Sequence, residues 1–174
     1  REKQYEVLEI HRETNQGDSI SYLSQADFVF HLAGINRPKS STEFHSGNID
    51  LTSFIVNTLA GFSRNVPIVL ASSTKVDSDS EYGVSKLAAE EIVQKYSKTS
   101  GSPSYIYRFS NVFGKWCKPN YNSFVATFCN NILNGIDISI HDPNAIVRLI
   151  YIDDVCEAFM GLLDGKTESG FHQV

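Results

Sequence analysis

Unbroken apolar runs alternate along the chain with segments whose apolar residues recur at helical spacing. The alternating residues 4–10 predict a strand, and buried strands are predicted at 27–34, 67–73, 104–109 and 147–152. Helices are predicted at 19–26, 42–62, 81–96, 123–134 and 153–165, with a loop at 111–122. Asp153 or Asp154 is the expected N-cap of the last helix.

Strands that are apolar throughout and alternate with helices indicate an α/β fold with a parallel sheet covered on both faces. In such doubly wound folds ligands bind beyond the carboxyl ends of the strands. Here the strands end in small or polar residues, in the stretches "HLAGIN", "ASST", "RFSN" and "YIDD". The informative chemistry is therefore expected at these four strand ends.

Composition narrows the function classes. A chain of 174 residues with 41% hydrophobic residues can bury one core but is short for two domains. The net charge of −5 offers no basic field for nucleic acid, and no apolar run is long enough to cross a membrane. The three cysteines and five histidines show no spacing typical of a metal site or disulfide framework, which favours a cytoplasmic protein without a metal.

The segment "EYGVSKLAAEE" places a phenol and an ammonium four residues apart, on one face of a helix. A nearby ammonium stabilises a phenolate, so Lys86 is expected to lower the pKa of Tyr82 toward the working range of an acid catalyst. A ketone reductase also needs an uncharged donor at the carbonyl oxygen. Ser73, at the end of the 67–73 strand, can supply it, with Ser72 and Thr74 as rivals.

The motifs "HLAG", "ASST", Tyr82-x-x-x-Lys86, "RFSNVFG" and "YIDDV" follow one another in an order and spacing that resembles the extended short-chain dehydrogenase/reductases. The resemblance implies a Rossmann-like fold and a catalytic triad of Ser73, Tyr82 and Lys86. It further implies NADPH, or alternatively NAD, as cofactor and a UDP-sugar as substrate. The stretches "HLAGINRP" and "NVFGKWCKPNYN" resemble members that reduce the C4 ketone of a UDP-linked deoxy-N-acetyl sugar in capsule or O-antigen biosynthesis.

Residue by residue, the resemblance assigns further roles. The cofactor would lie along Leu32, Ala33 and Gly34, where small residues allow a close approach. It would also contact Asn48, Ser72 and Phe109, besides Tyr82 and Lys86. Arg12 stands where members that use NAD carry an acid. An arginine at this position suits the 2′-phosphate of NADP. The substrate would contact Asn111, Lys118 and Arg148, the arginine holding the diphosphate.

The sequence departs from the family pattern in one respect. No glycine-rich G-x-x-G-x-x-G or G-x-G-x-x-G loop is present, and the chain opens at what should be the second strand. We therefore expect one partial NAD(P)-binding Rossmann-like domain over 1–174, in which 111–174 begins the substrate-binding part. The first βα unit and the end of the substrate lobe would be missing.

Other functions stay open at this point. A nucleotide-sugar 4-epimerase or 4,6-dehydratase would reuse the same triad, and the dehydratase would add an acid for which Asp77 and Asp79 are candidates. A non-catalytic, truncated nucleotide-binding module is the alternative from another class. Members of the family often dimerise, so a homodimer is a hypothesis. His31 is expected in the core, and Glu90 and Glu91 on a solvated helix face.

Overall fold

The computed structural model describes residues 5–165 and 167–174, which form two compact units. Unit 1 contains residues up to Tyr107 together with Ser169–His172, and unit 2 contains Arg108–Glu168 with Gln173–Val174. Each unit has its own sheet, and each is described separately below.

Unit 1 is built on a four-stranded sheet in the order β1-β2-β3-β6. The strands span Val29–His31, Ile68–Ser73, Ser104–Phe109 and Gly170–His172. β1 and β2 are parallel, with Val29 opposite Ile68, and β3 and β6 are parallel, with Tyr105 opposite Gly170. The expected α/β fold with a parallel sheet is confirmed.

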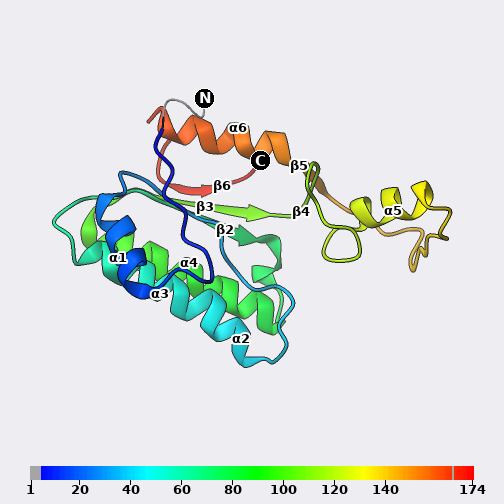
Figure 1. Cartoon of the computed structure of the whole chain (residues 1–174), viewed down its shortest axis with the longest axis horizontal. Coiled ribbons are helices and arrows are strands. Elements are labelled where there is room, and N and C mark those ends of the chain that lie inside the picture. The colour runs from blue at the N-terminus through cyan, green and yellow to red at the C-terminus, as the bar shows by residue number, and fades with distance from the viewer. Residues whose placement is uncertain (1–4, 166) are drawn as a thin grey trace. The chain divides into compact units, whose positions relative to one another are not determined.

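Helices cover one face of this sheet (Figure 1). They are α1 (Gln16–Gln25), α2 (Thr42–Phe44), the π-helix η2 (His45–Asp50), α3 (Leu51–Ala60), the 3₁₀-helix η3 (Thr74–Asp77) and α4 (Glu81–Ser100). Their apolar sides meet β2 and β3 in a core of Leu23, Ile55, Val56, Leu59, Val66, Ile68, Leu70, Ala89, Val93, Tyr96 and Ile106. Burial of this apolar surface is the main favourable contribution to folding.

Local sequence signals explain the bounds of α4. The Ser80 side chain accepts a hydrogen bond from the Gly83 N–H and caps the helix start. Gly101 ends the helix in the left-handed conformation, with φ 75°, which a glycine adopts without strain. The helix therefore runs one turn beyond the predicted end near Tyr96.

Unit 2 contains a second parallel pair, β4 (Asn111–Phe113) with β5 (Leu149–Tyr151), and the helices α5 (Phe124–Leu133) and α6 (Ile152–Leu163). Two predictions are corrected here. Asn111–Phe113 is a strand and not loop, because β5 supplies its hydrogen-bonding partner. The N-cap of α6 is Tyr151, so Asp153 and Asp154 lie in its first turn, where carboxylates complement the helix dipole.

Two further predictions are wrong in unit 1. Of the strand predicted at 4–10, residues 5–10 form no strand, and Val7 is 71% exposed; these residues have no paired strand to bury their apolar side. The single helix predicted at 42–62 is three segments, because a π-turn interrupts it at His45–Asp50. Among the residues that the structure describes, no helix combines the length and apolarity needed to span a membrane.

Candidate active site

The carboxyl end of β2 and the first turn of α4 bring Ser73 and Tyr82 together. Ser73 is the last residue of β2, and its side chain accepts a hydrogen bond from the Lys75 N–H at the start of η3. Tyr82 is the second residue of α4, and the Ser73 side chain lies close enough to interact with its hydroxyl. The short η3 segment returns the chain from one to the other, so the predicted pairing of this serine and tyrosine is present.

A glycine makes this close approach possible. A Cβ added at Gly83 would lie 2.2 Å from the Lys75 carbonyl oxygen and 2.7 Å from that of Ser78. Both are backbone atoms, so a larger residue would force α4 away from η3. Gly83 therefore sets the distance at which Tyr82 faces Ser73, a role that the sequence analysis missed.

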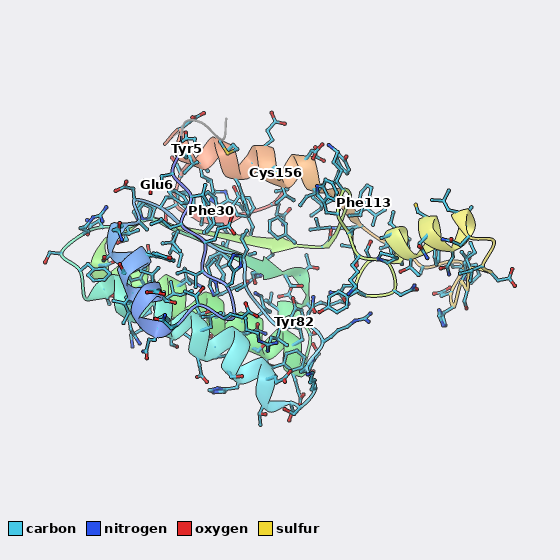
Figure 2. The ribbon with its side chains drawn as sticks, in the orientation of Figure 1. Tyr5, Glu6, Phe30, Tyr82, Phe113 and Cys156 are labelled. Atoms are coloured by element: carbon cyan, nitrogen blue, oxygen red, sulfur yellow. The ribbon has the colours of Figure 1, made fainter. Side chains whose placement is uncertain are left out.

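The tyrosine ring is fixed on its other side by an aromatic contact. Its centroid lies 5.9 Å from that of Phe44 in α2, with the ring planes at 51°. Figure 2 shows Tyr82 at the start of α4, beside α2. The hydroxyl and the ring are thus held by two different elements, which restricts the direction in which the phenol points.

Lys86 lies one turn further along α4 and is almost completely buried, with 4% of its surface exposed. Its Nζ donates a hydrogen bond of 2.7 Å to the carbonyl oxygen of Ala71 in β2. Burial lowers the pKa of Lys86 to about 8, although the carboxylate of Glu90 acts in the opposite direction. A lysine in this position can hold a proton near neutral pH and release it at modest cost.

The expected lowering of the Tyr82 pKa is not found. Burial raises the pKa of Tyr82 above its ordinary value, and the interaction with the Ser73 side chain only partly opposes this. The phenolate is disfavoured because the half-buried ring is removed from water. The protonated phenol is therefore the resting form, as an acid catalyst requires.

Asn48, in the π-turn, joins three elements through its side-chain amide. Its Oδ1 accepts a hydrogen bond from the Ile35 N–H at 2.7 Å, and its Nδ2 donates to the Ile35 carbonyl at 3.0 Å and to Ser85 Oγ at 2.9 Å. These bonds hold the segment after β1 against α4. The amide, expected near a cofactor, thus positions the strand end, and it is only 2% exposed.

His31 confirms the expectation of a core histidine, with 3% exposed surface. Its Nε2 lies 2.8 Å from Thr52 Oγ1, and the Thr52 hydroxyl donates to the Asn48 carbonyl. Because the single hydroxyl proton of Thr52 is committed to Asn48, the His31 Nε2 carries the hydrogen. Burial lowers the pKa of His31 to about 4, and the neighbouring charge of Lys86 adds to this effect.

The prediction that Glu90 lies on a solvated helix face is wrong. It is 0% exposed, whereas Glu91 is exposed as expected. Its carboxylate accepts a hydrogen bond from Ser72 Oγ at 2.5 Å. Glu90 lies four residues after Lys86 and three before the core residue Val93, so it shares their inward face. That spacing was readable in the sequence, but the charge of the residue obscured it.

The strand end after β1 is open and lies close to the lysine. Leu32 is 58% exposed, and Ala33 and Gly34 are exposed as well. A Cβ at Gly34 would lie 3.0 Å from Asn48 Oδ1 and 3.5 Å from Lys86 Nζ, so the glycine lets the strand end approach the ammonium closely. An open backbone ledge beside a cation fits a dinucleotide cofactor.

The remaining predicted residues lie at separate places. Arg12 is exposed in the turn that precedes α1 of unit 1. In unit 2, Asn111 N–H and Nδ2 donate to the Arg148 carbonyl at 3.4 and 3.2 Å, so these two predicted substrate residues are neighbours on β4 and at the start of β5. Their side chains are exposed, as is Lys118. The roles of all three stay predictions.

Phe109 and Asp153, also in unit 2, each have a partner within that unit. The centroid of the Phe109 ring lies 5.9 Å from that of Phe159 in α6. The expected contact of Phe109 with the cofactor stays a prediction. Asp153 accepts a hydrogen bond of 3.2 Å from Lys115, so one of the two adjacent acids has a cation from the same unit as partner.

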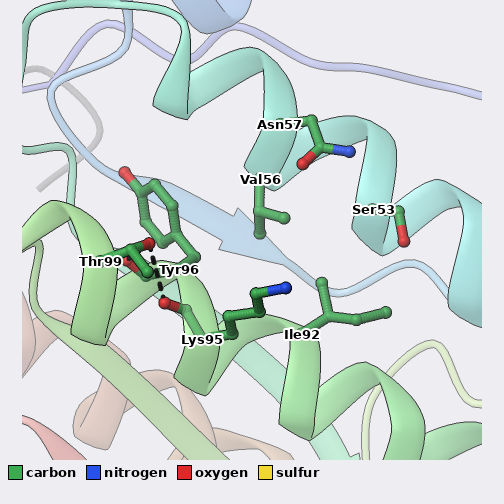
Figure 3. Close-up of a pocket in the computed structure, with 7 residues that line it drawn as sticks. All are labelled: Ser53, Val56, Asn57, Ile92, Lys95, Tyr96 and Thr99. Atoms are coloured by element: carbon green, nitrogen blue, oxygen red, sulfur yellow. Dashed lines mark hydrogen bonds between the residues drawn. The ribbon is translucent and has the colours of Figure 1, made fainter.

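A hollow of about 240 Å³ lies between α3 and α4. Figure 3 shows that α3 contributes Ser53, Val56 and Asn57 and that α4 contributes Ile92, Lys95, Tyr96 and Thr99. The Tyr96 hydroxyl donates to the Val66 carbonyl, and Lys95 is exposed. None of the predicted catalytic residues lines this hollow, so we do not regard it as the active site.

Comparison with known proteins identifies the family. The model described as the NAD dependent epimerase/dehydratase family matches residues 2–171. A UDP-2-acetamido-2,6-beta-L-arabino-hexul-4-ose reductase of Pseudomonas aeruginosa is 46% identical over 161 residues, which cover 92% of this chain and 43% of that protein.

Solved structures show the same fold. The capsular polysaccharide assembling protein CapF from Staphylococcus aureus is 36% identical, with a TM-score of 0.81 over 95% of this chain and 44% of that one. A UDP-glucuronic acid 4-epimerase from Bacillus cereus, solved in complex with NAD, is 22% identical, with a TM-score of 0.78 over 89% of this chain and 56% of that one. The chain thus spans about half the length of these relatives.

Proposed function

The chain belongs to the NAD dependent epimerase/dehydratase family, and on this premise we propose that the protein reduces the C4 ketone of a UDP-linked deoxy-N-acetyl sugar with NADPH, in capsule or O-antigen biosynthesis. The observation that carries the proposal is the interaction of the Tyr82 hydroxyl with the Ser73 side chain, with Lys86 one turn further on the same helix. The relative at 46% identity is a reductase named for such a hexulose.

The proposed roles follow from the state of each side chain. The protonated hydroxyl of Tyr82 donates its proton to the C4 oxygen as negative charge develops there. Ser73 donates a hydrogen bond to the same oxygen and adds no charge. When bound, the reduced nicotinamide supplies the hydride.

Lys86 contributes positive charge beside the tyrosine and the open strand end. With a pKa of about 8, its ammonium is charged at neutral pH, and it stabilises the phenolate that Tyr82 becomes after donating its proton. The ledge of Leu32, Ala33 and Gly34 leaves room for the ribose and nicotinamide next to Lys86. Ser72 and Asn48 complete the proposed cofactor environment within unit 1, and Phe109 stays a cofactor contact that the family resemblance predicts.

The outer cofactor and substrate contacts are part of the same proposal. Arg12 binds the 2′-phosphate and selects NADPH over NADH, since a guanidinium offers a fork of donors to phosphate oxygens. Arg148 binds the diphosphate of the UDP-sugar, with Asn111 and Lys118 beside it. In this scheme residues 111–174 begin the substrate-binding part of the Rossmann-like domain.

Reduction can be tested directly with the protein as its gene encodes it. A 4-keto UDP-sugar is added with NADPH, and nicotinamide absorbance is followed, with Tyr82→Phe as the matched control. Stoichiometric loss of NADPH in the wild type alone supports the proposal. A protein that purifies with tightly held NAD and interconverts sugars without consuming NADPH is an epimerase or dehydratase instead. One that binds neither cofactor is a non-catalytic module.

A homodimer is proposed as well, through the outer faces of α3 and α4. Val84 is 56% exposed and Leu87 is 38% exposed on α4, and the hollow of Figure 3 lies on the same helix pair. A sedimentation coefficient that stays at the monomer value over a wide range of concentrations would contradict this proposal.

A further inference from the structure

A completely buried carboxylate lies behind the candidate active site. Glu90 has no exposed surface, and an ionised carboxyl group in such a place is costly unless other groups compensate its charge. Two described partners contribute to this compensation. Ser72 donates a hydrogen bond to Glu90 Oε1, and Lys86 lies one helical turn away and interacts with it electrostatically.

Both partners belong to the elements that carry the catalytic residues. Ser72 precedes Ser73 at the end of β2, so the hydrogen bond to Glu90 fixes the backbone from which Ser73 projects. Lys86 is held from two sides, by the Ala71 carbonyl of β2 and by the charge of Glu90 on α4. The carboxylate is therefore at the point where β2 and α4 are held together.

We propose that Glu90 is a positioning residue of the candidate active site, which anchors the Ser72 end of β2 and keeps the buried ammonium of Lys86 charged. The proposal rests on the proposed reductase function, in which Lys86 acts as a cation. Glu90 touches neither substrate nor cofactor in this scheme, and it acts through its two neighbours.

Among the charged groups described around Lys86, Glu90 is the buried one. His31 faces the lysine from β1, and its lowered pKa of about 4 keeps it neutral at physiological pH. Tyr82 is protonated. The elements packed against α4 carry further titratable side chains that are exposed or half-buried, namely Glu43, His45, Asp50, Lys75 and Asp77. Solvent screens charges at such positions, whereas Glu90 acts from the interior.

The test compares Glu90→Gln with Glu91→Gln in the protein as its gene encodes it. Glutamine keeps the size of the side chain and an oxygen that can accept from Ser72, but it removes the charge. The Lys86 pKa should then fall below 8, and the alkaline limb of kcat/KM for the keto sugar should move to lower pH by about one unit or more. Glu91→Gln, on the exposed side, should leave the limb in place.

A second readout does not depend on activity. Because the pKa of Lys86 is lower in the folded than in the unfolded chain, stability should rise with pH from about 8 toward 10.5. In Glu90→Gln this rise should begin at lower pH. An unchanged onset in a folded variant overturns the proposal. If Glu90→Gln does not fold, Glu90→Asp takes its place, and retraction of the charge should shift the onset in the same direction; no shift again overturns it.

A double-mutant cycle tests the anchoring of β2. Ser72→Ala and Glu90→Ala should together destabilise the protein less than the sum of the two single effects, since each removes one partner of the same hydrogen bond. Strictly additive effects contradict the anchor. If the wild type reduces no 4-keto UDP-sugar, the proposed function fails, while the unfolding measurements still decide whether Glu90 holds Ser72 and Lys86.

Discussion

Replacing His31 with glutamine should remove a specific part of the acid sensitivity of this protein. The imidazole is 3% exposed, and its pKa falls from 6.5 to about 4. Glutamine does not titrate, and its amide can donate to Thr52 Oγ1 as the His31 Nε2 does. The substitution therefore removes the proton-binding site and keeps the hydrogen bond.

The sign and size of the effect follow from linkage. The unfolded chain takes up a proton on His31 near pH 6.5, but the folded chain does so only near pH 4. The stabilisation that results from the neutral form of His31 is fully present above about pH 6.5. It is lost as the pH falls from about 6.5 to about 4. One pKa unit corresponds to about 1.4 kcal/mol, so the total loss is about 3 kcal/mol, of which about 2 kcal/mol is lost by pH 5.

The assay is urea unfolding of the wild type, His31→Gln and His141→Gln between pH 4 and 7. His141 is exposed after α5 and serves as the control, because its replacement leaves the buried histidine in place. Carboxylates titrate in the same range, so the informative quantity is the wild-type free energy minus that of His31→Gln. This difference should fall by about 2 kcal/mol from pH 7 to pH 5. A difference that is independent of pH would refute the reasoning.

Three further substitutions test the site. Tyr82→Phe keeps the ring against Phe44 but removes the acid, so kcat should fall by a factor on the order of 10² or more while NADPH affinity changes little; a variant with more than a tenth of wild-type turnover contradicts the role. Gly83→Ala would place a Cβ 2.2 Å from a backbone oxygen and should cost about 2–3 kcal/mol in urea unfolding. Its control, Gly161→Ala in α6, meets no described atom within 4 Å and should be neutral or stabilising, and equal effects at the two glycines would refute the steric argument. Arg12→Ala should weaken NADPH more than NADH in fluorescence titrations, and an equal loss for both would exclude contact with the 2′-phosphate.

The alternation of strands and helices could be predicted from the sequence because each periodicity is local. The 67–73 and 104–109 runs became β2 and β3, and the helix with Tyr82 and Lys86 formed as expected. The strand predicted at 4–10 was wrong for residues 5–10 because a strand depends on a neighbour as well as on its own pattern. β4 was missed for the same reason, since its partner β5 lies almost forty residues away.

Within the candidate site, the sequence by itself determined that Tyr82 and Lys86 share a helix face and that Ser73 ends a strand. Spacing and motif order carry that information. Only the tertiary structure decided the environment of these groups. Tyr82 has a raised pKa because the fold buries it, although its sequence neighbour Lys86 suggested the opposite.

The same distinction explains Asn48 and Glu90. Asn48 bonds to Ser85, 37 residues later, and Ser72 bonds to Glu90, 18 residues later, so neither partner could be found in a local pattern. Glu90 repeats the helical phase of Lys86 and Val93, and the sequence therefore determined which face of α4 it occupies. Whether that face meets solvent or a protein interior depends on the element packed against it, and here β2 supplies the hydroxyl that makes a buried carboxylate tolerable.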